Sequence, residues 1–429
     1  MNQQEMMELK VRVSGAFRGG TPIDRQPLFA GRLDQLNDVL NAALQPGRTV
    51  ILFGERGVGK TSIARAVPEI IRTSKGYGRF NCGTINCEET DNFDSLWRKI
   101  FRELTLITEP TELGLKGQAL QGQALQSDVP LESRVPNREL NGDDVRHLVG
   151  KISDHSLIIV DDLEKLTDRS ARALLADTIK NLSDHPSKLA LILVGVADSV
   201  EKLIPDHHSI ERALLQVPVP RMSMSELIQI INTGLHAANL TAVDSVIARI
   251  ARLAHGLPHY AHSIGLYSAF KAIESGRTTV TAQDVLEATK TTVQKSHAIQ
   301  SDYNKATGAP RKQNLFAKVL RACALAEEDE FGYFPAAAVS LPMGRIMGRQ
   351  YYVPNFSRHL FDLCEQERGP VLEKIGAPRR IRFRFANPMM QPFVLIHDYS
   401  QGNLTHEFLD EIRDGRGYGE INLPGGTKQ

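Results

Sequence analysis

Apolar, β-prone runs alternate with segments of helical periodicity along the first half of the chain. The runs are Phe80–Cys82, Thr49–Phe53, Leu157–Val160 and Leu189–Val194. Between them, apolar residues recur every three or four positions over 31–44, 93–104 and 170–182, which predicts amphipathic helices. Strands that are apolar on both faces and alternate with helices are typical of a parallel sheet covered on both sides. The pattern therefore predicts an α/β fold with a three-layer αβα core.

The pattern becomes purely helical from Ser223 to about Gln300. Within this stretch, Thr281 to Asp284 open one helix in the manner of a capping box, with Asp in the place of the usual Glu. We expect an all-α lid over 223–300, following a core over 1–222.

The last part of the chain begins after a basic, proline-containing linker at 309–313. Helical spacing over 314–326 and 354–367 is followed by two β-like runs, 371–375 and 380–385. Helices followed by a hairpin predict a winged-helix domain over 310–400, with a tail over 401–429.

Two segments interrupt this scheme. Residues 1–28 are polar and contain Gly19-Gly20 and two prolines, so we expect them to be extended. Residues 107–142 lose all periodicity and contain the tandem repeat Gly-Gln-Ala-Leu-Gln at 117–126. A long stretch without a helical or strand pattern predicts a surface insertion.

Between the first strand of the core and its helix, eight residues match the phosphate-binding pattern G-x-x-x-x-G-K-[ST]. They are Gly54, Glu55, Arg56, Gly57, Val58, Gly59, Lys60 and Thr61, and Ser62 continues into the helix. Glycines allow successive backbone N–H groups to turn inward and form an anion site at a helix N-terminus. Lys60 is placed to reach the β- and γ-phosphates of ATP, and the Thr61 hydroxyl to bind Mg²⁺.

An acidic pair, Asp161-Asp162, directly follows the apolar run at 157–160. The carboxyl ends of parallel strands meet at one edge of the sheet, so the pair is expected beside the phosphate loop. We assign Asp161 to Mg²⁺, through water, and Asp162 to orienting or deprotonating the attacking water.

The order of five motifs resembles that of the AAA+ superfamily, in particular the origin-recognition initiators and the related STAND switch ATPases. These motifs are Leu28–Arg32, the phosphate loop, the acidic pair, Gly195–Asp198 and Gly256–Pro258. The resemblance implies that Phe29, Gly31 and Arg32 border the adenine. It also implies that Asp198 is the sensor-one residue and that Pro258 packs near the base.

The same resemblance places Arg212 at the arginine-finger position, where it would act on the γ-phosphate in a neighbouring subunit of an oligomer. A surface ion pair is the alternative role for Arg212. Two positions depart from the pattern of these families. The initiators usually carry Asp-Glu at the acidic pair, and many AAA+ lids carry an arginine where this chain has His259. Either His259 contacts a phosphate or it is an ordinary lid histidine. Both departures suggest a slow, switch-like ATPase.

The formal net charge of +1 leaves DNA binding to a local patch. Arg379, Arg380 and Arg382 concentrate positive charge on the expected wing, although alternation along the strand also fits a solvated face. The cysteines, Cys82, Cys87, Cys323 and Cys364, are interpreted as core residues in a reducing cytosol rather than as a zinc site. With no apolar run of membrane-spanning length and no signal-peptide pattern, we expect a cytoplasmic protein.

The function expected from the sequence is an ATP-binding and ATP-hydrolysing switch that assembles through Arg212 and passes its state to a partner protein or to DNA. The alternatives are a DNA-binding adaptor that holds nucleotide structurally with little turnover, and a platform that binds protein through its winged helix. The cofactors expected are ATP and Mg²⁺.

Overall fold

The computed structural model describes most of the chain in two compact units. The described residues are 1–18, 31–45, 47–74, 80–108, 127–185, 187–204, 210, 212–308, 315–329, 331–377, 380–405 and 407–408. The sheet unit comprises Pro22–Glu55 and Gly59–Val219, and the helical unit comprises Met1–Thr21, Arg56–Val58 and Pro220–Gln429. Each unit is described by itself.

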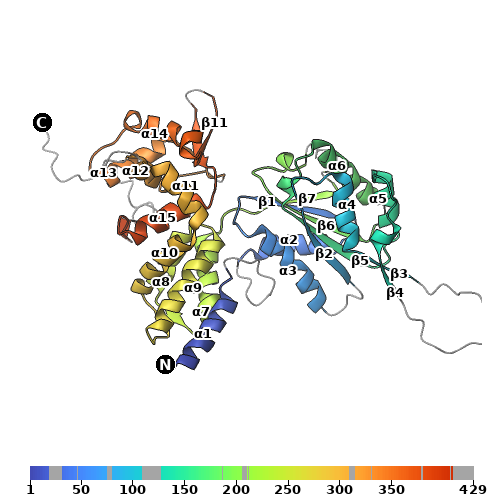
Figure 1. The fold of residues 1–429 in the computed structure, drawn as a ribbon, viewed down its shortest axis with the longest axis horizontal. Helices are drawn as coiled ribbons and strands as arrows, with labels where there is room; N and C mark the ends of the chain where they lie inside the picture. Colours follow the sequence, from blue (N-terminus) through green and yellow to red (C-terminus); the bar gives the residue numbers. More distant parts are fainter. Residues whose placement is uncertain are drawn as a thin grey trace, which may run out of the picture. The chain divides into compact units, whose positions relative to one another are not determined.

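The sheet unit is built on five parallel strands in the order β2-β5-β6-β1-β7 (Figure 1). The strands are β1 (Thr49–Gly54), β2 (Phe80–Asn86), β5 (His155–Asp161), β6 (Leu189–Val196) and β7 (Leu214–Pro218). The three central strands are almost entirely buried, as expected for apolar runs covered on both faces. The strand order places β6 between the strand that leads to the phosphate loop and the strand that leads to the acidic pair.

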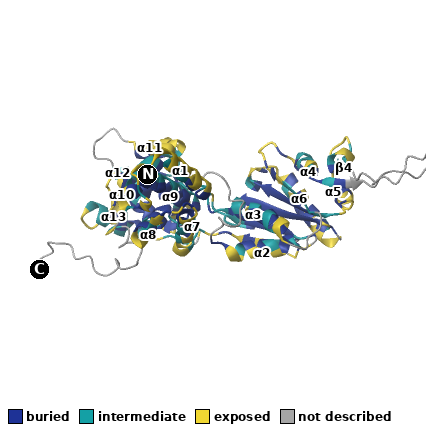
Figure 2. Cartoon of the chain, turned by 90° about the horizontal axis from the view of Figure 1, so that it is seen from below, coloured by how far each residue is buried: buried dark blue, intermediate teal, exposed yellow. Residues whose placement is uncertain are grey.

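Helices cover both faces of this sheet (Figures 1 and 2). On one side lie α2 (Leu33–Ala43) and α3 (Lys60–Thr73), and on the other α4 (Phe93–Arg102), α5 (Gly142–Val149) and α6 (Arg169–Asp184). The second set shares one apolar cluster with Ile51, Ile158 and Leu191 of the sheet. The predicted three-layer P-loop fold is confirmed.

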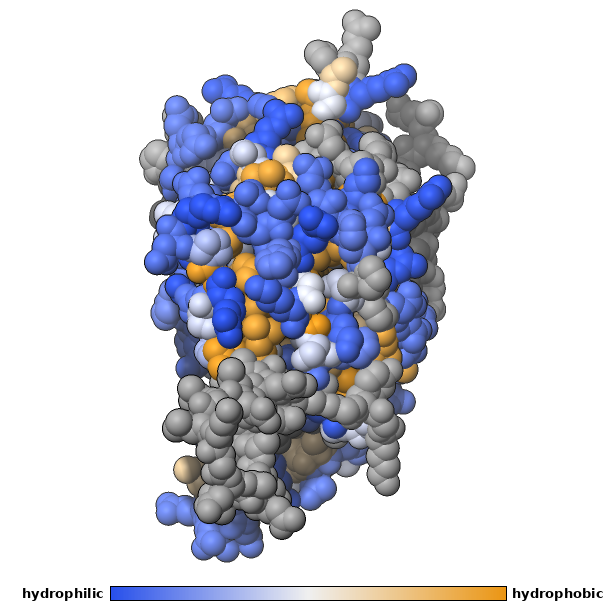
Figure 3. Space-filling model, turned by 90° about the vertical axis from the view of Figure 1, so that its right-hand side faces the viewer, coloured by the Kyte–Doolittle hydropathy of each residue, from blue (hydrophilic) through white to orange (hydrophobic). Residues whose placement is uncertain are grey.

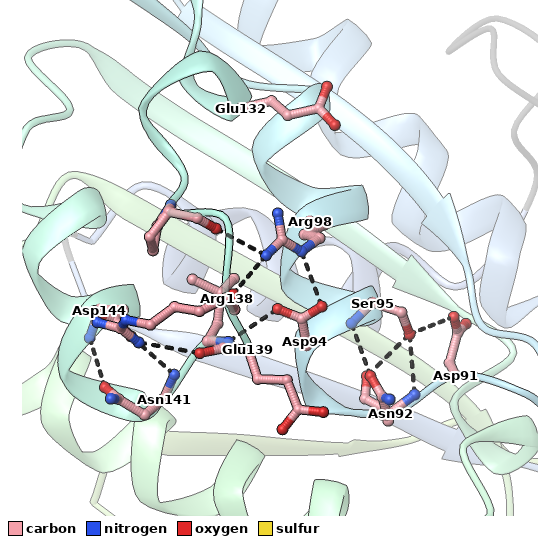
Figure 4. Close-up of polar contacts among 12 residues, drawn as sticks. Asp91, Asn92, Asp94, Ser95, Arg98, Glu132, Arg138, Glu139, Asn141 and Asp144 are labelled. Carbon is pink, nitrogen blue, oxygen red and sulfur yellow. Dashed lines mark hydrogen bonds and ion pairs between the residues drawn. The ribbon is translucent and has the colours of Figure 1, made fainter.

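The expected surface insertion has ordered ends. A hairpin forms from β3 (Thr105–Thr108) and β4 (Ser127–Pro130), while the tandem repeat at 117–126 lies outside the described residues. After the hairpin, Arg98 of α4 fastens the chain by donating to the carbonyls of Pro136 at 3.0 Å and Arg138 at 2.7 Å (Figure 4). Asp94 completes the contact by accepting from the Leu140 N–H at 2.9 Å. Side chains of α4 thus hold residues 131–141 to the core.

The helical unit contains four helices of the expected lid. They are α7 (Met224–Ala237), α8 (Asp244–Ala254), α9 (Pro258–Glu274) and α10 (Ala282–Lys295). Two short strands, β8 (Thr241–Ala242) and β9 (Thr279–Val280), pair in parallel between them. The predicted capping box is present at α10, where Thr281 and Asp284 exchange hydrogen bonds.

Residues 3–16 form a helix, so the expectation of an extended chain was wrong there, while residues 19–28 lie outside the described residues. Helix α1 (Gln3–Ala16) begins at an Asn2–Glu5 capping box and packs on α7 and α9. Phe17 follows it and is buried, with its ring where a Cβ atom on Gly234 or Gly265 would come within 2.5 Å. The two glycines form the notch that receives this ring and fixes the end of α1.

The C-terminal part of the helical unit joins helices to a small antiparallel sheet. The helices are α11 (His297–Thr307), α12 (Leu315–Ala324), α13 (Ser340–Met347), α14 (Ser357–Asp362) and α15 (Met390–Ser400). The sheet has the order β10-β12-β11, formed by Phe334–Pro335, Arg382–Phe385 and Leu372–Ile375. Arg321 and Asp398 form an ion pair between α12 and α15, and both side chains are largely buried.

The surface is mainly polar on the side seen in Figure 3, where hydrophobic side chains show as small patches between hydrophilic ones. Among the helices that the structure describes, none is both long enough and apolar enough to cross a membrane.

The capping box of α10 yields a stability prediction. Arg277 contacts both carboxylate oxygens of Asp284, at 2.9 and 2.7 Å, and the Thr281 N–H donates to the same carboxylate at 2.8 Å. Asp284→Ala removes all three hydrogen bonds and should lower the free energy of unfolding by about 1–3 kcal/mol. Chemical denaturation measures this loss, and Asp302→Ala, at an exposed position of α11, should change stability by less than about 0.5 kcal/mol.

The pH dependence of that loss follows from the pKa of Asp284. Burial alone would raise this pKa, but hydrogen bonds from Arg277 and Thr281 outweigh burial and hold it below its ordinary value. A depressed folded-state pKa stabilises the fold above the unfolded pKa of about 4 and ceases to do so as the pH falls through the folded value. The difference between wild type and Asp284→Ala should therefore shrink below about pH 4. An unchanged difference at lower pH contradicts this account.

Candidate nucleotide site

The loop from Gly54 to Gly59 depends on glycine at both ends. Gly54 has φ +149°, and a Cβ atom there would lie 2.3 Å from the carbonyl oxygen of Val219. Gly59 has φ +99° and directly precedes α3. A side chain at either position would be strained. The tight turn predicted from the glycine pattern is present, and its backbone angles require glycine at these two positions.

Lys60 is buried at the start of α3. Its Nζ donates to the carbonyls of Gly54 at 3.0 Å and Glu55 at 2.8 Å, which folds the side chain back over the loop. Burial lowers the pKa of Lys60 to about 8, although nearby carboxylates, led by Glu164 and Asp161, act in the opposite direction. Lys60 thus places a cation among acidic groups at the loop.

Thr61 and Asp161 meet although they are 100 residues apart. Thr61 Oγ1 donates to Asp161 Oδ1 at 3.2 Å, and the N–H of Asp162 donates to the same oxygen at 3.0 Å. Burial raises the pKa of Asp161 above its ordinary value, against the effect of these two hydrogen bonds. A hydroxyl and a carboxylate that converge at one point are hard oxygen donors, which fits Mg²⁺.

Asp162 faces a different neighbour. Its backbone has φ +57°, in the left-handed region, and its Oδ2 accepts from Lys165 Nζ at 2.7 Å. The side chain is 41% exposed. The pair Asp161-Asp162 therefore divides, with the first carboxylate at Thr61 and the second in an ion pair with Lys165.

Two residues that the sequence analysis did not identify lie near this site. Glu164 Oε2 accepts from the Val196 N–H at 2.9 Å at the end of β6, and Arg65 of α3 acts electrostatically on Asp161. The sequence features that could have identified them are a third carboxylate two positions after the acidic pair and an arginine one helical turn after Thr61. Neither belongs to a named motif, so neither was selected.

Other predicted residues lie elsewhere in the sheet unit. Gly31 and Arg32 both have positive φ and precede α2, and Arg32 is buried, whereas Phe29 lies outside the described residues. Asp198 follows β6 by two residues and pairs with Lys202 at 2.7 Å.

Arg212 is exposed, and its carbonyl accepts from Arg48 at 2.7 Å. It comes before β7, which runs parallel to β1 from the pair Thr49–Leu214. Arg212 therefore lies at the amino end of these strands, whereas the phosphate loop follows the carboxyl end. The structure does not bring Arg212 to Lys60 and Asp161 of the same chain.

In the helical unit, Pro258 begins α9 and is buried, while His259 is half-buried and packs edge-on against Tyr260. These two residues are not placed relative to Lys60 and Asp161, which belong to the sheet unit.

The expected wing arginines differ in their surroundings. Arg382 forms an ion pair with Asp329 and Arg384 one with Glu373. Arg380 is exposed, and Arg379 lies outside the described residues. Of the four arginines at 379, 380, 382 and 384, Arg382 and Arg384 are thus paired with carboxylates of the same chain.

All four cysteines are free. Within the described ranges, no cluster of three or more His, Cys, Asp or Glu side chains is suited to holding a metal ion. Burial raises the pKa of Cys87 to about 12, as expected for a thiol of the core.

Comparison with solved structures finds similar chains among archaeal proteins. They include Cdc6p of Pyrobaculum aerophilum (17% identity, covering 91% of this chain and 99% of that chain, TM-score 0.43). Others are the Orc1 protein of Aeropyrum pernix in complex with DNA (14%, 90% and 94%, 0.44) and a Walker-type ATPase of Pyrococcus abyssi (16%, 88% and 99%, 0.45). No curated protein matches the sequence.

A protein-family model described as "AAA ATPase domain" matches residues 29–194. The match takes in the phosphate loop, the acidic pair and four of the five strands of the sheet. Residues 29–194 are therefore similar to an AAA ATPase domain.

Proposed function

We propose that the protein is an ATP-binding and ATP-hydrolysing molecular switch. The contact between Thr61 Oγ1 and Asp161 Oδ1 at 3.2 Å is the observation that carries this proposal. It joins the phosphate loop to the acidic pair at a single point, beside the buried ammonium of Lys60. Phosphoryl transfer depends on positioning and on neutralising the charge of the phosphates, and these three groups supply both.

In this function each group has a separate task. Lys60 would leave the carbonyls of Gly54 and Glu55 for the β- and γ-phosphates, while the N–H groups of the loop and of α3 surround them. Thr61 would bind Mg²⁺, with Asp161 holding it through water. The ion would neutralise charge on the phosphate oxygens.

Replacing Lys60 tests this assignment. Lys60→Ala removes the buried ammonium that bonds the loop carbonyls, so ATP affinity should fall by at least about tenfold and phosphate release to background. Calorimetric titration with ATP and Mg²⁺ measures the first effect, and a steady-state phosphate assay the second.

Lys151→Ala is the matched control, because Lys151 is exposed beyond the end of α5. It should bind and hydrolyse ATP as wild type does. Equal phosphate release by wild type and Lys60→Ala contradicts the enzyme and favours an adaptor that holds nucleotide with little turnover.

Assembly is proposed from the position of Arg212. The loop and Arg212 lie at opposite ends of β1, and its six residues span roughly 17 Å between first and last Cα. An exposed arginine so far from its own loop is suited to the γ-phosphate of a neighbouring copy, where it would stabilise charge in the transition state.

A trans role predicts complementation between two inactive variants. Arg212→Ala should lower phosphate release on the order of 10³-fold and leave ATP affinity unchanged. Mixed with Lys60→Ala, it should regain activity, because the Lys60→Ala subunit supplies Arg212 to an intact loop. Arg134→Ala, at another exposed position, is the control. Full activity of Arg212→Ala alone, or no recovery in the mixture, contradicts the proposal.

The output of the switch is assigned to the C-terminal module, either towards a partner protein or towards DNA. We interpret helices α12 to α14 with the sheet β10-β12-β11 as a winged helix. The α13–α14 pair has the order of a helix-turn-helix, and the Arg358 side chain on α14 is 91% exposed. Arg358, whose contact with Asp362 is long at 3.9 Å, and the exposed Arg380 are therefore better placed for phosphate contact than Arg382, which is held by Asp329.

Charge reversal tests DNA as the output. Arg358→Glu with Arg380→Glu should weaken binding to duplex DNA by at least about tenfold at low salt and flatten its salt dependence. The control pair Arg12→Glu and Arg134→Glu makes the same change in net charge at exposed positions outside this module. Equal loss in both double variants, measured by fluorescence anisotropy, means that no DNA site lies here and favours a protein partner.

A further inference from the structure

Glu164 contacts the end of β6, the strand beside the one that leads into the phosphate loop. It belongs to a short 3₁₀ turn, Leu163–Lys165, that follows the acidic pair. Its Oε2 accepts from the N–H of Val196, and Val196 is paired in register with Gly54, the first residue of the loop. Since adjacent strands are about 4.8 Å apart, the Glu164 carboxylate is one strand away from the loop.

Lys60 completes this connection. Its Nζ donates to the carbonyl of the same Gly54 at 3.0 Å. Nearby carboxylates raise the pKa of Lys60 against the effect of burial, and Glu164 contributes most, ahead of Asp161, Glu55 and Asp162. The ammonium that would contact the β- and γ-phosphates thus has Glu164 as its dominant acidic neighbour.

Glu164 has one oxygen available for a further contact. Oε2 is anchored on Val196, and within the part of the chain that the structure describes, Oε1 makes no hydrogen bond or ion pair. The side chain is half-buried. An anchored carboxylate with one available oxygen has a fixed orientation, as a group that positions a water molecule requires.

Asp162 differs from Glu164 in its anchor, which is the exposed side chain of Lys165 rather than a backbone N–H of the sheet. Its side chain is 41% exposed and forms an ion pair with Lys165 at 2.7 Å. The backbone of Asp162 is left-handed, with φ +57°, so the chain turns at this residue before it reaches Glu164. Among the four carboxylates that act on the Lys60 ammonium, Asp162 has the weakest effect.

We propose that Glu164, and not Asp162, is the carboxylate that orients the attacking water and accepts its proton during ATP hydrolysis. The inference rests on the proposed ATPase function. As the water oxygen bonds to the γ-phosphorus, the bond from this phosphorus to the β,γ-bridging oxygen breaks, and its electron pair leaves with ADP. The water proton passes to Glu164 Oε1 and is then released to the phosphate product or to solvent.

The choice of variants distinguishes the catalytic role of Glu164 from a purely structural one, in which it only holds the end of β6. Glu164→Gln keeps an oxygen that accepts from the Val196 N–H but cannot take a proton from water. Glu164→Asp keeps the carboxylate on a shorter side chain. Asp162→Asn is the competing variant, because the acidic pair assigns the same role to Asp162 and this change also converts a carboxylate to an amide of the same size. Glu139→Gln, at an exposed position outside the site, is the matched control.

The experiment measures ATP affinity, thermal stability and single-turnover phosphate release for full-length wild type and these variants. Glu164→Gln should melt and bind ATP as wild type does but release phosphate at least about 100-fold more slowly, and it should retain ATP through gel filtration. Glu164→Asp should exceed Glu164→Gln in rate. Glu139→Gln should release phosphate at the wild-type rate, and Asp162→Asn should be impaired less than Glu164→Gln.

The outcomes separate the two proposals. If Glu164→Gln hydrolyses ATP as fast as wild type, the assignment of Glu164 is overturned and the proposed ATPase function stands. The same holds if Asp162→Asn is inactive while Glu164→Gln is active. A slower Glu164→Gln that has also lost stability or ATP affinity makes the role structural and overturns the assignment as well. Wild type that neither binds nor hydrolyses ATP overturns the proposed function itself.

Discussion

The parallel register of β1, β6 and β5 is the constraint on which the nucleotide site depends. Gly54 pairs with Val196, and Val160 pairs with Leu193, so these strands end at one edge of the sheet. The loop that carries Lys60 and the carboxylate of Asp161 therefore meet without any direct sequence proximity. Apolar side chains on both faces of the strands keep this register, because a one-residue slip would reverse which side chains face each helical layer.

Two strand ends contribute groups of complementary charge to this edge. The loop after β1 carries the Lys60 ammonium, and Asp161 and Glu164 come from the end of β5 and the turn that follows. Burial acts against the charged forms of both Lys60 and Asp161, which lowers the pKa of the first and raises the pKa of the second. Groups held in this way gain most from a ligand that brings both phosphates and a cation. This arrangement suits the metal-bound triphosphate that we propose as the ligand.

Local patterns predicted the parts of the molecule that local chemistry determines. The buried strands, the glycine turn and the capping box of α10 were all predicted from the sequence, because each depends on residues a few positions apart. Helix α1 was missed because only Val13 and Ala16 of its residues are buried, and because a notch made by Gly234 and Gly265, far away in sequence, fixes its end. The separate surroundings of Asp161 and Asp162 were not predicted, because they depend on a left-handed backbone angle at Asp162 that Asp adopts without a distinguishing pattern.

The most direct test of the central claim is to locate the metal. Crystals grown with Mn²⁺ in place of Mg²⁺ and a slowly hydrolysed ATP analogue would show the ion by anomalous scattering. The account predicts one peak about 2.1 Å from Thr61 Oγ1, facing Asp161, with the β- and γ-phosphates at Lys60 Nζ. A nucleotide bound away from the turn that begins at Gly54, or a metal peak out of reach of both Thr61 and Asp161, would contradict it.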